Sequence, residues 1–143
     1  MKLYQEDAET AVIGAICMDG SSLMEVADII RPESFYVARY RAIFNAVVEL
    51  DEQGQEVEII SIGDYLEKRD PNINWLAVLA EMSKNCPSTR NIKAYAIIVD
   101  EYYQLRTLYS AGSSVMEVCV DPDISVTDKV AAAQESILSL GSG

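Results

Sequence analysis

Apolar residues recur every three to four positions along most of the chain, the spacing that places side chains on one face of an α-helix. Glycine or proline residues interrupt this spacing at Gly20, Pro32, Gly54, Pro71 and Pro87. The helices expected between these breaks span about 7–18, 22–30, 37–53, 61–69 and 73–84. The side chains expected to face a common core are Ala8, Ala11, Val12, Ala15, Ile16, Leu23, Val26, Ala27, Ile30, Tyr40, Ile43, Phe44, Val47, Leu50, Trp75, Leu76, Leu79 and Met82.

Only one short run, Val57–Ile60, has the composition of a β-strand. A solitary strand of this length cannot form a sheet, so we expect an extended connector there, followed by a helix that Ser61 caps. Gly54 is expected to end the preceding helix in the left-handed conformation. The sequence therefore predicts an all-α fold.

The pattern changes after Pro87, because no proline interrupts a long helical stretch from 89 to about 120. Apolar and small residues then alternate steps of four and three, and they do so again after the turn Asp121–Asp123. This 3.5-residue period is typical of a coiled-coil seam, and two such helices joined by a tight turn fold into an antiparallel hairpin. The expected seam consists of Ile98, Tyr102, Leu105, Tyr109, Gly112, Met116, Cys119, Val126, Val130, Ala133, Ile137 and Leu140.

These patterns predict two parts and a tail. The first is a compact globular helical head over 1–88, and the second is a long helix and antiparallel helical hairpin over 89–140 that serves dimerisation. Residues 141–143 are expected to begin a linker or to be a cloning remnant.

Leu108, Val115 and Leu138 lie off the expected seam. Two helices cannot cover an additional apolar stripe by themselves, so we expect these side chains to contact a second hairpin. The alternative is that the hairpin lies on the head and hides them. The expected interface residues are Leu105, Leu108, Tyr109, Val115, Met116, Ile137 and Leu138.

Composition narrows the class of partner. The 143 residues include 23 acidic and 11 basic ones, for a formal charge of −12. Nucleic-acid binding depends on neutralising phosphates, so this charge argues against tight direct binding to DNA. No apolar run approaches the ~20 residues that a membrane span needs, and the first residues lack a signal-peptide pattern. We expect a cytoplasmic protein.

The sequence contains no recognisable catalytic, cofactor or metal site. It has no histidine, and Cys17, Cys86 and Cys119 lack metal-type spacing. Each cysteine lies among apolar or small residues, which suggests a buried structural thiol. No glycine precedes a lysine, so a phosphate-binding loop of the Gly-x-x-x-x-Gly-Lys type is excluded. Acidic pairs such as Glu6 with Glu9 are expected at helix caps, where they complement the helix dipole.

An ordered series of segments over residues 6–106 resembles the N-terminal domain of replicative DNA helicases of the DnaB type. The segments are Ala8–Ala15, Glu25–Tyr36, Arg41–Ala46, Glu67–Arg69, Leu76–Leu79, Pro87–Ile92 and Ala94–Val99. Tyr40 stands where the family commonly has histidine, and Asp70–Asn74 lacks the expected glycine-rich turn. After Arg106 the similarity is one of pattern only.

The resemblance implies a helical head followed by a hairpin, with hairpins pairing into dimers and three dimers forming a collar in a hexameric helicase. It implies docking of the C-terminal domain of primase or of a helicase loader. ATP and magnesium would belong to a motor domain that is absent from this chain, so no enzymatic activity is expected of the chain itself. The alternative is a stand-alone protein that binds a host helicase as a loader, decoy or inhibitor.

Overall fold

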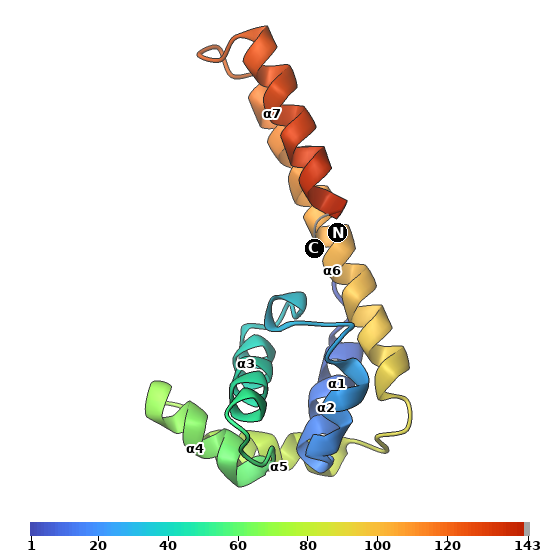
Figure 1. The fold of residues 1–143 in the computed structure, drawn as a ribbon, viewed down its shortest axis with the longest axis vertical. Helices are drawn as coiled ribbons and strands as arrows, with labels where there is room; N and C mark the ends of the chain where they lie inside the picture. Colours follow the sequence, from blue (N-terminus) through green and yellow to red (C-terminus); the bar gives the residue numbers. More distant parts are fainter. Residues whose placement is uncertain (142–143) are drawn as a thin grey trace. The chain divides into compact units, whose positions relative to one another are not determined.

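Short-range polar contacts fix where most helices begin. The computed structural model describes residues 1–141. Their helices are α1 (Glu6–Met18), η1 (Gly20–Ser22), α2 (Leu23–Val26), η2 (Pro32–Ser34), α3 (Ala38–Glu52), α4 (Ile59–Arg69), α5 (Trp75–Asn85), α6 (Ile92–Cys119), α7 (Val126–Leu138) and η3 (Ser139–Gly141), shown in Figure 1. Asn74 accepts from the backbone N–H of Ala77 at the start of α5, and Ser125 accepts from that of Asp128 at the start of α7. No strand occurs among these residues, so the predicted all-α fold is confirmed.

The chain divides into two units, one of residues Lys2–Tyr103 and one of Met1 with the residues from Gln104 onward. In the first unit, which we call the head, α1 packs against α5 and α3, while α4 packs against α3 and α5. The first part of α6 adds to the same core. Its buried apolar residues are Ala8, Val12, Ile13, Ala15, Ile16, Cys17, Leu23, Val26, Ile30, Phe35, Ile43, Phe44, Ala46, Val47, Leu50, Ile62, Leu66, Trp75, Leu79, Cys86, Ile92, Ala96 and Val99.

Close packing of α1 on α5 depends on a residue without a side chain. A Cβ atom at Gly14 would lie 2.9 Å from the carbonyl oxygen of Met82 and 3.0 Å from the Cβ of Cys86. Both distances are shorter than ordinary van der Waals contacts, so a larger residue would push the two helices apart. A hydrogen bond of 2.9 Å between the hydroxyls of Thr10 and Tyr40 ties α1 to α3.

Several predicted elements agree with the structure and others need correction. The long helices agree to within a few residues, and Gly54 has the expected positive φ of 72°. The second helix is shorter than predicted, since α2 ends at Val26. The fourth begins earlier, at Ile59, because Glu58 is its N-cap and Ser61 completes a capping box three residues later.

Two predicted core side chains lie outside the core. Ala27 is exposed because α2 ends one residue before it. Leu76 is also exposed, because in α5 the side that packs inward carries Trp75 and Leu79.

Candidate protein-interaction surface

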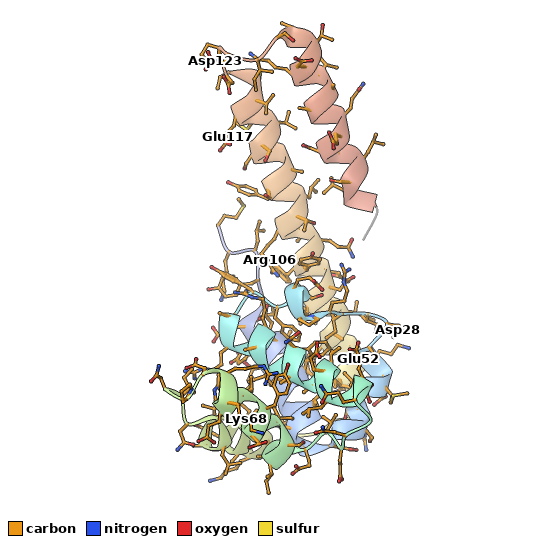
Figure 2. All side chains as sticks on the ribbon, turned by 60° about the vertical axis from the view of Figure 1, so that its left-hand side comes forward. Asp28, Glu52, Lys68, Arg106, Glu117 and Asp123 are labelled. Atoms are coloured by element: carbon orange, nitrogen blue, oxygen red, sulfur yellow. The ribbon has the colours of Figure 1, made fainter. Side chains whose placement is uncertain are left out.

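The second unit is an antiparallel hairpin in which α7 returns alongside α6 (Figures 1 and 2). The ammonium group of Lys129 on α7 donates to the carbonyl oxygen of Cys119 on α6, at 2.8 Å. That contact satisfies one of the carbonyls left unpaired at the end of α6 and holds the two helices together near the turn. A hydrogen bond between α6 and α7 therefore stabilises the hairpin beside its turn.

Partly covered side chains identify the sides of the two helices that face each other. Those that share one face of α6 are spaced by four, four and three residues, and those on α7 and the following turn by three, one, three and four. The facing residues are Thr107, Ala111, Val115 and Val118 on α6, and Lys129, Ala132, Ala133, Ser136 and Leu140 on α7 and the following turn. Arg106 and Ser113 are also partly covered, but they lie on another side of α6. Small side chains dominate this contact, so little apolar area is buried inside the hairpin.

The larger apolar side chains of both helices lie outside this contact. Met116 is 72% exposed, Tyr109 is 56% exposed and Val130 is 53% exposed. We call seven of the exposed apolar side chains of the hairpin the outer stripe. They are Leu105, Leu108, Tyr109, Met116, Val126, Val130 and Ile137, while Val120 and Leu138 are also exposed but do not belong to the stripe.

Helix geometry places both halves of the outer stripe on the same side of the hairpin. Four members of the stripe follow facing residues by one position, namely Leu108 and Met116 on α6 and Val130 and Ile137 on α7. The other three, Leu105, Tyr109 and Val126, lie seven or eleven residues before Met116 or Ile137 and therefore on the same lines of their helices. One residue is a rotation of about 100° in the direction of the chain. Because the helices are antiparallel and both right-handed, equal rotations turn both halves toward one side. The stripe is therefore one continuous apolar face.

The other flank of α6 is polar. Arg106 and Glu117 are about three helical turns apart and so lie along one line of the helix (Figure 2). Ser110 and Ser113 lie on the same flank. The stripe and this flank therefore give α6 an apolar side and a polar side.

This geometry corrects the predicted seam. Leu105, Tyr109 and Met116 were expected to pack against α7, but all three are exposed, as are Val126, Val130 and Ile137. Of the residues placed outside the seam, Leu108 and Leu138 are exposed as expected, whereas Val115 is partly covered on the side that faces α7. Leu138 is not part of the outer stripe. It directly follows Ile137 and lies farther around α7.

No group of metal-ligating side chains gathers among residues 1–141. In that same range, no helix is long and apolar enough to cross a bilayer. Cys17 and Cys86 are buried as predicted, but Cys119 is exposed, because it lies at the end of α6 beside the outer stripe. Burial raises the pKa of the Cys17 thiol to about 12, with a smaller contribution from Cys86.

We expect the three thiols to react very unequally. At pH 8 Cys17 is almost entirely protonated, and the thiolate is the reactive form. A thiol-specific disulfide reagent should modify one thiol of the folded chain quickly, that of Cys119, and reach Cys17 and Cys86 only on unfolding. Peptide mapping after a short exposure would identify the modified residue. Fast labelling of Cys17 would contradict its burial.

The carboxylate of Glu9, which the sequence predicts at a helix cap, is buried in the structure. Glu9 is only 1% exposed, and its oxygens accept from the backbone N–H of Tyr36 at 2.9 Å and of Val37 at 3.1 Å. These donors belong to the segment that leads into α3, not to the helix of Glu9 itself. The carboxylate therefore joins α1 to the start of α3 inside the head.

Comparisons with known proteins match the arrangement. The model of the DnaB-like helicase N terminal domain matches residues 1–101. A replicative DNA helicase DnaB of Pasteurella multocida is 30% identical over 137 residues, which are 94% of this chain and 29% of the relative. The replicative DNA helicase DnaC of Bacillus subtilis is 26% identical over 136 residues, with 94% of this chain and 30% of the relative covered. The chain thus spans about 30% of the length of these relatives.

Two solved structures share the fold. The N-terminal domain of DnaB helicase from Mycobacterium tuberculosis superposes with a TM-score of 0.89 at 24% identity, covering 97% of this chain and 99% of that one. A DnaB-like replicative helicase, solved in a study of its interactions with primase, superposes with a TM-score of 0.80 at 25% identity, covering 96% of this chain and 31% of that one. The chain therefore belongs to the family of DnaB-like helicase N-terminal domains.

Proposed function

We propose that this chain is an assembly and docking domain of a replicative helicase, and that it dimerises through the outer stripe of the hairpin. The observation that carries the proposal is the placement of exposed Leu105, Tyr109 and Met116 on the same side as exposed Val130 and Ile137. A continuous apolar face of this kind on a small domain marks a binding surface.

A second copy is the occupant that best fits the face. Its two halves come from antiparallel helices, so a second hairpin related by a two-fold axis would present the same apolar residues and form a four-helix contact. Gly112 also lies on this side of α6, and a Cβ there would meet nothing within 4 Å in the single chain. A residue without a side chain at that position allows a second backbone to approach closely. Three such dimers would form the collar that the family resemblance implies.

Sedimentation of the wild-type chain tests the first step. We expect a dimer in the micromolar range and a shift toward monomer on dilution. A chain that remains monomeric at high micromolar concentration would show that the outer stripe does not suffice for assembly.

We also propose that the domain docks primase or a helicase loader. Support comes from the family and from the structural relative solved in a study of its interactions with primase. Titration of the chain with the C-terminal domain of the cognate primase, followed by calorimetry, tests docking separately from dimerisation. Absence of heat at saturating concentrations would contradict docking of primase. Docking of a helicase loader would then be the alternative to test.

The charge predicts that the chain does not hold DNA by itself. The formal charge is −12, and the longest run of basic residues is Lys68-Arg69. At physiological salt we expect a Kd for labelled oligothymidylate no tighter than about 100 μM, because few phosphates can be neutralised. Fluorescence anisotropy provides the measurement. Micromolar binding that weakens steeply with salt would contradict the prediction.

A further inference from the structure

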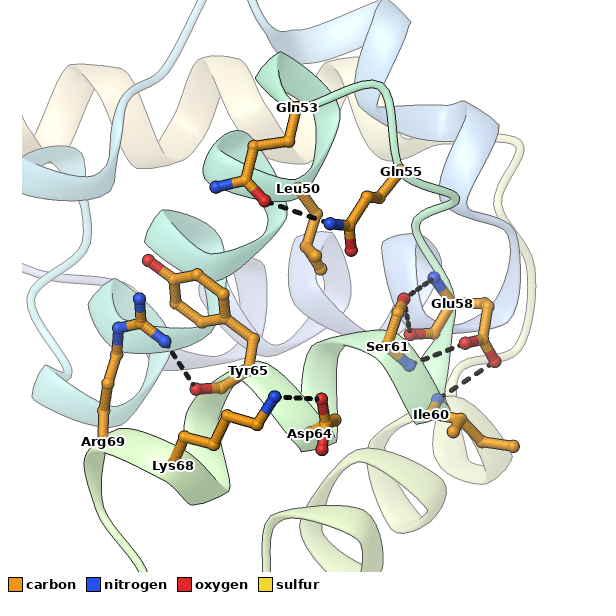
Figure 3. A pocket seen from close by; sticks show the side chains of 10 residues that line it. All are labelled: Leu50, Gln53, Gln55, Glu58, Ile60, Ser61, Asp64, Tyr65, Lys68 and Arg69. Atoms are coloured by element: carbon orange, nitrogen blue, oxygen red, sulfur yellow. Dashed lines mark hydrogen bonds and ion pairs between the residues drawn. The ribbon is translucent and has the colours of Figure 1, made fainter.

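We draw no further inference here: the strongest candidate, the exposed apolar pair of Ile60 on α4 and Leu76 on α5, of which Ile60 also lines the groove between α3 and α4 (Figure 3), carries none because nothing in the structure shows what covers it.

Discussion

Met116→Glu should dissociate the dimer while leaving each chain folded. Met116 is 72% exposed in the single chain, so the new carboxylate costs nothing until a second hairpin covers it. In the dimer it would lie unpaired in an apolar contact, and each dimer would contain it twice. A cost of about 3 kcal/mol or more is expected, which corresponds to roughly a 100-fold rise in Kd or more. Analytical ultracentrifugation over a concentration series measures the change.

Ser110→Glu provides the control for charge alone. Ser110 is exposed on the polar flank of α6, so the same added charge should leave the dimer intact. Tyr109→Glu should behave like Met116→Glu, because both positions belong to the outer stripe. If Met116→Glu and Ser110→Glu are equally dimeric, the chains pair through another surface.

Glu9→Ala should strongly destabilise the head. The substitution removes the buried carboxylate that accepts from the N–H groups of Tyr36 and Val37, and so breaks the contact between α1 and the segment leading into α3. Hydrogen bonds to a charged group contribute about 1.5–3 kcal/mol each. We expect the free energy of unfolding to fall by about 3 kcal/mol, measured by urea denaturation.

Glu6→Ala is the matched control for Glu9→Ala. Glu6 is exposed in the first turn of the same helix, where a carboxylate contributes about 0.3–1 kcal/mol through the helix dipole. Glu9→Gln should fall between the two, since its amide oxygen can still accept from one backbone N–H. Equal stabilities of Glu9→Ala and Glu6→Ala would mean that the contact between α1 and the start of α3 does not hold in solution.

Local signals made most of the fold predictable. The apolar spacing of Ile43, Phe44, Val47 and Leu50 predicts α3 almost to the residue. Its end is predictable because Gly54 readily adopts the positive φ that follows the last turn of a helix. The start of α4 was harder to predict from the sequence. Ser61 is a preferred N-cap residue and Glu58 is not, so only the backbone conformation shows that Glu58 is the N-cap.

The hairpin shows where pattern reasoning fails. The sequence of α6 holds two stripes on different sides of the helix, one through the smaller residues Ala111, Val115 and Val118 and one through the larger residues Leu105, Tyr109 and Met116. Large apolar residues usually pack against the neighbouring helix, and on this basis the sequence predicts that the larger stripe faces α7. In the structure, the small residues face α7 and the large ones face outward. The dimer that we propose would reverse this preference, because the main apolar contact of the hairpin would then lie between chains.

Contacts between residues far apart in the sequence could not be predicted, for a different reason. Glu9 lies in the first turn of a helix, where acidic residues are common, and nothing nearby indicates that it is buried against residues 36–37. The groove lined by Leu50 and Gln53 near the end of α3 and by Tyr65 and Arg69 of α4 likewise depends on the packing of these two helices. The interface residues and the boundary expected near residue 88 stay predictions, because they concern association and independent folding rather than the conformation of one chain.

Intermolecular contacts of the outer stripe provide the most direct test of the proposed assembly. A mixture of chains with ¹³C-labelled methyl groups and unlabelled chains allows isotope-filtered nuclear Overhauser effects to be recorded between copies. We predict contacts from the methyl groups of Met116, Val130 and Ile137 to a second chain, and none from Val118, which faces α7. A sample that sediments as a dimer but shows intermolecular contacts only from the head, and none from these three residues, would contradict dimerisation through the hairpin.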